Sequence, residues 1–192
     1  GCSVTGVDLH EPYVALATSL TERTGLSDRV TFARASATAL PFPAECVDVA
    51  WTQHAAMNIA DRGSLYSEIA RVLVPGGRFA LYDVLAGDGT PLEFPVPWAR
   101  DPGMSTLVNE AQQRVLLAQS GLDVVSWTDL TAEGIRWIGE RSAASKRHDA
   151  DSPALGLVLV MGADFPSLVA MLGRNLREGR ARLVQAVARR ES

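Results

Sequence analysis

The sequence has few cysteines and no long hydrophobic run. Its 192 residues include only Cys2 and Cys46, whose separation suits neither a metal-ligand pair nor a disulfide framework. So sparse a use of cysteine is typical of a reducing compartment, and we expect a cytoplasmic protein without a metal site. The longest apolar runs, such as 155–162, fall far short of the roughly 20 residues that cross a bilayer. We therefore expect no membrane partner.

An excess of positive charge is also missing. Lys and Arg total 18 against 22 Asp and Glu, a formal net charge of −4, so bulk charge does not attract a nucleic acid. Several arginines gather between Arg174 and Arg190, which we interpret as a solvated helix face and strand edge. Hydrophobic residues make up 47% and charged residues 21%, as in a globular domain with a buried core.

Strand-like and helix-like segments alternate through the first two-thirds of the sequence. Strands are expected over 4–7, 30–33, 46–52, 78–84, 122–127 and 183–188. Helices are expected from Glu11, after Asp61, and over 105–120, 131–144, 155–161 and 167–178. The Pro75-Gly76-Gly77 triplet predicts a tight turn, and 87–103 a long loop. Such alternation predicts an α/β fold with a mostly parallel, doubly wound sheet, whose ligands bind at the carboxyl ends of the strands.

Polar residues follow the first two of these strands. Asp8 ends the first strand, where a carboxylate can accept hydrogen bonds from a ribose diol or can cap the helix that follows. Ser36 and Ala37 follow the second strand and could contact the edge of a base, or could belong to a plain polar loop. The residues alone leave both pairs of readings open.

Polar and aromatic residues also follow the third and fourth strands. The segment Thr52-Gln53-His54 carries more functional groups than a simple turn needs. His54 could accept a proton near neutral pH, or could be an ordinary structural or surface histidine. Asp83 ends the fourth strand and is a candidate base or substrate anchor, or a capping residue.

Taken together, four segments resemble the class I S-adenosylmethionine-dependent methyltransferases, in their small-molecule branch of methyltransferase type 11. This branch includes ubiquinone-biosynthesis and sarcosine/dimethylglycine N-methyltransferases. Each segment alone is weak evidence for this family, but the order and spacing of the four segments are fairly specific to it. The segments are Val-Thr-Gly-Val-Asp-Leu (4–9), Ala-Thr-Ala-Leu-Pro-Phe (37–42), Val-Asp-Val-Ala-Trp (47–51) and Arg-Val-Leu-Val-Pro-Gly-Gly-Arg (71–78).

The resemblance implies S-adenosylmethionine as the cofactor. It implies that Asp8 binds the ribose hydroxyls, that Leu9 packs on the adenine and that Ser36 and Ala37 meet the adenine edge. The family more often has an Asp where Ser36 stands. The region that includes His54 would flank the methionine portion and the substrate. The implied cofactor contacts are Asp8, Leu9, Ser36, Ala37, Thr52 and Gln53.

Methyl transfer from a sulfonium to an N, O or C atom of a small-molecule acceptor needs in-line attack on the methyl carbon. Positioning and exclusion of water supply most of the acceleration. A general base adds about 10²–10⁴-fold, and we expect His54 and Asp83 to be the catalytic candidates. Two other functions remain: a nicotinamide-dependent oxidoreductase, which also needs an acid such as Asp8, and a non-catalytic binding protein on the same fold.

The resemblance also implies that part of the family's fold lies outside this sequence. No glycine-rich loop precedes Asp8, so we expect a domain whose first strand, glycine-rich loop and following helix are absent from the N-terminal side. The missing strand would lie in the middle of the sheet. We expect a core formed by 1–128 and 180–192, with an antiparallel last strand, and a helical cap over the substrate at about 129–179. We also expect this stretch alone to bind the cofactor weakly.

Overall fold

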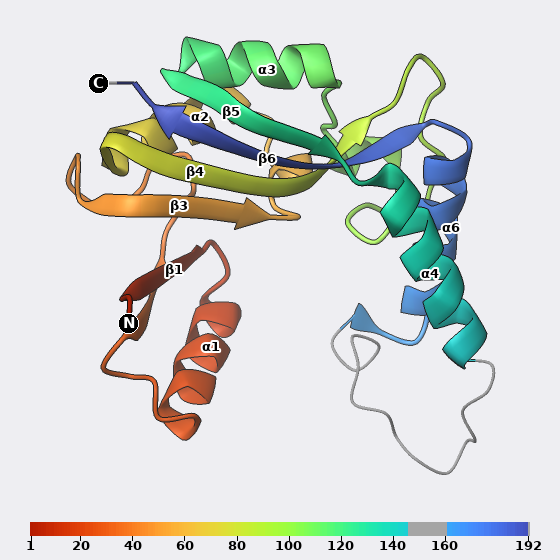
Figure 1. Ribbon diagram of the computed structural model, residues 1–192. Helices are drawn as coiled ribbons and strands as arrows, with labels where there is room; N and C mark the ends of the chain where they lie inside the picture. Colours follow the sequence, from red (N-terminus) through yellow and green to blue (C-terminus); the bar gives the residue numbers. More distant parts are fainter. Residues whose placement is uncertain (146–160, 192) are drawn as a thin grey trace.

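The computed structural model describes residues 1–145 and 161–191, which form two β-sheets with flanking helices (Figure 1). The strands are β1 (Val4–Asp8), β2 (Val30–Arg34), β3 (Val47–Gln53), β4 (Leu73–Ala86), β5 (Leu122–Asp129) and β6 (Ala181–Arg190). The helices are α1 (Glu11–Arg23), α2 (Arg62–Val72), α3 (Glu110–Gln119), α4 (Thr131–Ser145) and α6 (Phe165–Arg177), with short 3-10 helices η1 (Ala56–Asn58) and η2 (Pro102–Met104). The helix expected over 155–161 lies almost wholly outside the described residues.

The strands pair as an α/β fold requires. β1 and β2 are parallel, and the larger sheet has the order β3-β4-β6-β5. β3 and β4 are parallel, whereas β6 runs antiparallel to both of its neighbours, which confirms the expected antiparallel last strand. Among the described residues, β1 and β3 are not paired with each other. The described strands therefore form two separate sheets, one of two strands and one of four.

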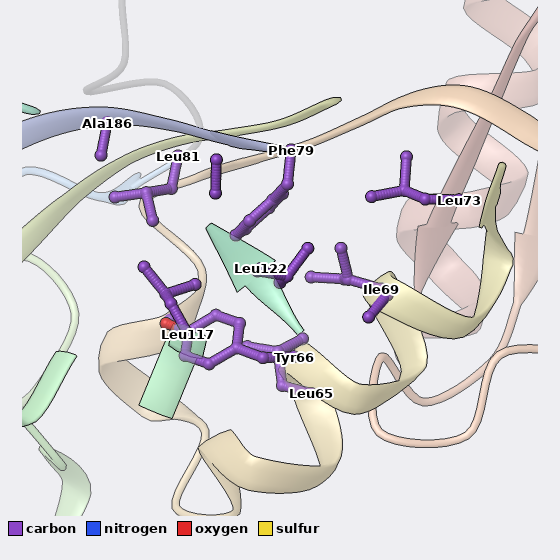
Figure 2. Packing of buried hydrophobic residues seen from close by; sticks show 12 residues of the cluster. Leu65, Tyr66, Ile69, Leu73, Phe79, Leu81, Leu117, Leu122 and Ala186 are labelled. Atoms are coloured by element: carbon purple, nitrogen blue, oxygen red, sulfur yellow. The ribbon is translucent and has the colours of Figure 1, made fainter. Parts of the chain in front are cut away.

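The main core lies between the larger sheet and helices α2 and α3, which cover one of its faces (Figure 1). Alternate residues of β4 enter this core, so Phe79 and Leu81 are buried while Arg78 is exposed. Tyr66 from α2 and Leu117 from α3 meet them there (Figure 2). The β1–α1–β2 unit lies on the other side of β3 in Figure 1.

Two helix starts show how local chemistry sets the boundaries. Asp61 accepts a hydrogen bond from the Ser64 N–H at 2.9 Å, so α2 begins where expected. The helix expected over 105–120 begins later, at Glu110, because Asn109 and Gln112 form a capping box. Within this helix Leu117 is fully buried, whereas Val115 is 54% exposed.

The Pro75-Gly76-Gly77 triplet lies inside β4 rather than before it. Leu73 already pairs with Val47, and pairing resumes between Arg78 and Val49, so the residues between Leu73 and Arg78 bulge out. Gly76 has a φ of 77°, which favours glycine. A Cβ on Gly77 would lie 2.8 Å from the Val74 carbonyl oxygen. The expected tight turn is thus a bulge within β4, and the strand begins at Leu73 rather than at the expected residue 78.

A second, smaller core lies where the larger sheet meets α4 and α6. Its buried members are Met57, Val84, Ile138, Leu176, Ala181 and Leu183. These residues hold the α4–α6 pair against the carboxyl end of β4 and the start of β6. None of the helices in the described part of the chain is both long enough and apolar enough to cross a membrane.

Leu117→Ala is expected to lower the free energy of unfolding by about 2–5 kcal/mol, because it opens a cavity in the main core. Val115→Ala, on the exposed face of the same helix, is expected to change it by less than about 0.5 kcal/mol. Urea unfolding of both variants measures the difference. Equal losses in the two variants would show that α3 is packed on a different face.

Candidate active site at the strand ends

The candidate residues after β3 and β4 lie at one edge of the larger sheet. Gln53 pairs with Tyr82 in the parallel register, so the His54 turn and Asp83 follow at the same level. Asp8 and Ser36 lie together at the end of the smaller sheet, where the Ala35 N–H donates to the Asp8 carbonyl oxygen at 3.1 Å. The structure thus groups the candidates in two sets.

Asp8 is partly buried at the end of β1. Its Oδ1 accepts a hydrogen bond from the His10 N–H at 2.7 Å, whereas its Oδ2 has no hydrogen-bond partner in the described part of the chain. The carboxylate therefore shapes the entry to α1 and still offers an acceptor. Leu9 beside it is 62% exposed, so an apolar surface adjoins that acceptor.

Ser36 and Ala37 form a tight turn after β2. The Ser36 Oγ lies 2.8 Å from the Thr38 Oγ1 and accepts from the Thr38 N–H at 3.2 Å. The Ala39 N–H donates to the Ser36 carbonyl oxygen at 3.0 Å. These bonds engage the Ser36 hydroxyl inside the turn, so its contact with an adenine stays a prediction. Ala37 packs against the main core.

His54 lies on a strained turn just after β3. Its φ of 50° lies in the left-handed region, which few residues other than glycine adopt, although histidine does so more often than most. Its N–H donates to the Tyr82 carbonyl oxygen at 2.8 Å, and its ring centroid lies 4.7 Å from that of Tyr82. Desolvation lowers the pKa of His54 below its usual value of 6.5, so the imidazole is neutral at pH 7. One side of the ring is desolvated against Tyr82 while the residue still reaches the surface, so a neutral imidazole can accept a proton there.

Asp83 is buried beneath the His54 turn, with 2% of its surface exposed. Its Oδ2 accepts from the Ala56 N–H at 3.1 Å and its Oδ1 from the Val84 N–H at 3.0 Å. Burial raises the pKa of Asp83 to about 6, while those hydrogen bonds and the charge of Arg62 oppose the rise. The buried carboxyl group thus binds the first N–H of η1 and does not face solvent in this structure.

A buried polar network lies next to Asp83. Arg62 on α2 donates to Gln113 Oε1 at 3.3 Å and to the Thr106 carbonyl oxygen at 3.2 Å. Gln113 Nε2 in turn donates to the hydroxyl of Tyr66. The Nε of Arg62 is buried and has no partner within the described residues. This network joins α2, α3 and the segment that leads into α3.

The long loop after β4 is fastened beside the His54 turn. Asn58 Nδ2 donates to the carbonyl oxygens of Trp98 at 3.0 Å and Met104 at 2.9 Å. The Trp98 Nε1 donates to Ser105 Oγ at 3.0 Å, which fixes the indole within the loop. The loop therefore has a defined path over the carboxyl end of the larger sheet.

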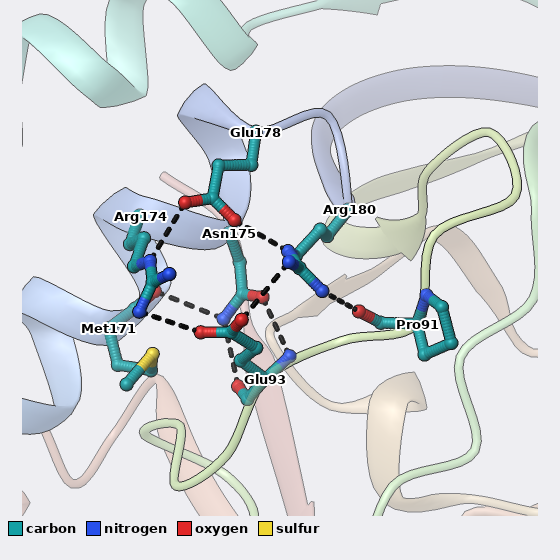
Figure 3. Close-up of polar contacts among 7 residues, drawn as sticks. All are labelled: Pro91, Glu93, Met171, Arg174, Asn175, Glu178 and Arg180. Atoms are coloured by element: carbon teal, nitrogen blue, oxygen red, sulfur yellow. Dashed lines mark hydrogen bonds and ion pairs between the residues drawn. The ribbon is translucent and has the colours of Figure 1, made fainter.

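The same loop is also fastened to α6 (Figure 3). Asn175 is fully buried and holds the backbone of Glu93 from both sides: its Oδ1 accepts from the Glu93 N–H at 2.8 Å and its Nδ2 donates to the Glu93 carbonyl oxygen at 2.9 Å. The Glu93 carboxylate pairs with Arg174 at 2.9 Å and Arg180 at 3.0 Å. Arg174 is exposed, as expected for this cluster of arginines, whereas Arg180 is mostly buried, and both bind the loop.

Sequence reasoning missed Asn58 and Asn175. Asn58 falls in the polar stretch after β3 but carries no motif. Asn175 offers a clearer signal, because it follows Leu168 and Leu172 at the i, i+4, i+7 spacing of one helix face. A polar residue on such a face must find partners inside the protein. No group of three or more potential metal ligands gathers in the described residues.

Comparison with known proteins identifies the family. Residues 1–81 match a family described as "Methyltransferase domain". The 27-O-demethylrifamycin SV methyltransferase of Amycolatopsis mediterranei is 32% identical over 131 residues, which are 67% of this chain and 48% of that protein. The dimethylglycine N-methyltransferase of Parasynechococcus marenigrum is 27% identical over 112 residues, 58% of this chain and 40% of that protein. The chain thus spans about half or less of the length of these two relatives.

A solved structure shows the same fold. The geranyl diphosphate C-methyltransferase of Streptomyces coelicolor, in complex with Mg²⁺, geranyl diphosphate and S-adenosyl-L-homocysteine, superposes with a TM-score of 0.78 at 19% identity. The match covers 99% of this chain and 63% of that chain. Residues 1–81 therefore belong to this methyltransferase domain family, and the relatives and the mixed α/β architecture agree with that assignment.

Proposed function

We propose that the whole protein transfers a methyl group from S-adenosylmethionine to an N, O or C atom of a small-molecule acceptor. The family match over residues 1–81 carries the proposal, because it spans every expected cofactor contact and His54. When bound, the cofactor supplies the methyl group on its sulfonium. The chain's own residues hold the cofactor, orient the acceptor and exclude water.

The residues at the end of β1 fit the ribose and adenine of the cofactor. The Oδ2 of Asp8 lacks a partner among the described residues and can accept from ribose hydroxyls. Leu9 is exposed beside it and offers an apolar surface for a base. We assign the adenine edge to Ser36 and Ala37, and the methionine portion to Thr52 and Gln53, which end β3.

His54 is our preferred base for the acceptor. Its neutral, exposed ring is at the strand ends, whereas Asp83 is 2% exposed and bonded to the Ala56 N–H beneath the turn. Asp83 therefore supports the reaction by holding the turn that carries His54, unless that turn opens. Both residues remain in the proposed catalytic set.

The loop after β4 and the α4–α6 pair form the proposed cap over the acceptor. The contacts of Asn58 and Asn175 support this assignment, because they fasten the loop to the His54 turn and to α6. We keep the core at 1–128 and 180–192 and the inserted helical cap at about 129–179; the loop after β4 is the part of the core that adds to this cap.

We place the protein in the cytoplasm, without a nucleic-acid or membrane partner. The net charge of −4 and the scarcity of cysteine support this placement. The small-molecule acceptors of the relatives, rifamycin among them, agree with a small-molecule substrate.

Calorimetry on the complete gene product tests the cofactor. We expect S-adenosylmethionine to bind, and Asp8→Ala to weaken binding at least tenfold because two hydroxyl hydrogen bonds are lost. Asp123→Ala, an exposed acid on the remote strand β5, is the control and should leave the affinity unchanged. Unchanged affinity in Asp8→Ala would contradict the site. Binding of a nicotinamide dinucleotide in place of S-adenosylmethionine would favour the oxidoreductase.

His54→Asn tests the base, because asparagine tolerates the positive φ at this position and so keeps the turn. We expect methyl transfer to an N–H or O–H acceptor to fall about 10²–10⁴-fold with cofactor affinity retained. In the wild type, the acid limb of the pH–rate profile should lie below pH 6.5, since the pKa of His54 is lowered. Wild-type turnover in both His54→Asn and Asp83→Asn would show that neither residue is the general base.

Asp83→Asn tests the buried carboxyl group through stability. The pKa of Asp83 is about 6 in the folded protein and 3.8 ordinarily, so the folded state binds this proton more tightly. The wild-type free energy of unfolding therefore falls as the pH rises from 3.8 to about 6, and this group contributes at most about 3 kcal/mol to the fall. Asp83→Asn carries no titrating group at this position, so its free energy of unfolding should not fall in this way. Urea unfolding at several pH values between about 4 and 6 should show the stability difference between wild type and variant changing with pH.

Asp61→Asn provides a comparison of opposite sign. Hydrogen bonds from Ser64 lower the pKa of Asp61, so its stabilising effect is present above the ordinary pKa and is lost as pH falls. Parallel stability curves for wild type and Asp83→Asn would contradict the buried, raised carboxyl group.

A further inference from the structure

The β1–α1–β2 unit makes its polar contacts almost entirely within itself. Its ion pair, between Arg34 and Glu11 at 2.9 Å, is internal, and Thr5 meets Thr31 across its two strands at 3.1 Å. No hydrogen bond or ion pair within the described residues joins positions 1–35 to any position beyond 39. In the described residues, the first polar contacts between this region and the later elements therefore come just after β2, at Leu40.

An acid–base pair on α2 meets the chain just after that unit. Glu68 and Arg71 are one helical turn apart and form a two-pronged pair: Arg71 Nε donates to Glu68 Oε1 at 2.6 Å and Arg71 Nη2 donates to Glu68 Oε2 at 2.8 Å. Both side chains are more than half buried. Each thereby fixes the rotamer of the other.

The pair binds the backbone of the loop that follows Ser36. Glu68 Oε2 accepts from the Leu40 N–H at 2.7 Å, and Arg71 Nη2 donates to the Leu40 carbonyl oxygen at 3.1 Å. Arg71 Nη1 donates to the Phe42 carbonyl oxygen at 2.7 Å. Both backbone groups of Leu40 are thus satisfied by α2, as a neighbouring strand would satisfy them.

We propose that Glu68 and Arg71 are positioning residues that set the β1–α1–β2 unit, with Asp8 and Ser36, against the strand ends of β3 and β4. The link to catalysis rests on the proposed function, but the placement itself does not. Arginine suits this role because its planar fork reaches Glu68 and two carbonyl oxygens together, whereas lysine is a single point donor.

The two cysteines allow the placement to be measured. Cys2 precedes β1 and Cys46 precedes β3; both are exposed, and the sequence has no others. Nitroxide labels on both report the distance between the unit and the larger sheet by continuous-wave and pulsed electron paramagnetic resonance. We expect one narrow distribution in the wild-type chain, and a distribution at least twice as wide in Arg71→Gln.

Arg114→Gln is the matched control. Arg114 forms a similar helical pair with Glu110 at 2.9 Å on α3, but that pair does not bind the loop after β2. We expect this variant to keep the narrow distribution. A wide distribution in the wild type, an unchanged width in Arg71→Gln, or equal broadening in Arg114→Gln would each overturn the proposal.

The double variant Glu68→Arg/Arg71→Glu separates positioning from helix stability. It restores an ion pair within α2 but reverses the donors and acceptors offered to Leu40. We expect its thermal midpoint to lie closer to that of the wild type than the midpoint of Arg71→Gln does, while the distribution of label distances stays wide. Recovery of the narrow distribution would show that the pair acts only within its helix. Asp8→Ala should leave the distances unchanged, so failure of the cofactor site and failure of this placement give different results.

Discussion

The phase of β4 is the constraint on which the site depends. Its antiparallel pairing with β6, from Arg78 opposite Arg189 to Ala86 opposite Ala181, leaves no freedom in which residues face α2 and α3. Phe79 and Leu81 must enter the core, and the two-residue period then sends Asp83 to the same side. A strand cannot bury Phe79 and expose Asp83 without a bulge between them. Asp83 is therefore a buried carboxyl group because of hydrophobic packing several residues away.

The residue before Asp83 contacts the same turn from the opposite face of β4. Tyr82 points away from Asp83, and its ring packs against His54, while its carbonyl oxygen accepts the His54 N–H. Asp83 meanwhile holds the Ala56 N–H. Two successive residues of β4 thus hold one turn from both sides. The positive φ of His54 is maintained by this double hold, since an isolated histidine would relax to a more common conformation.

Much of this could be predicted from the sequence, and the failures have physical causes. Alternation and capping residues located the strands and α2, because those signals are local. Asp83 was expected at the strand end as a base, a substrate anchor or a capping residue, and its burial became clear only from the structure. The start of α3 was misplaced because the capping box formed by Asn109 and Gln112, which sets the first turn of the helix, was not recognised in the sequence. The bonds from Glu68 and Arg71 to Leu40 join positions about thirty residues apart, and no local pattern encodes such a contact.

Two loops leave the sheet next to the site, and helix side chains hold both through backbone groups. α2 holds the backbone of Leu40 and Phe42, and Asn175 of α6 holds that of Glu93. Backbone groups that leave a sheet must find other partners, and a side chain on a packed helix is a rigid one. A contact with N–H and C=O groups does not depend on the loop's own side chains. The path of each loop can then stay fixed while its side chains change. Changes in loop side chains can therefore alter what a fold of this kind binds without repacking its core.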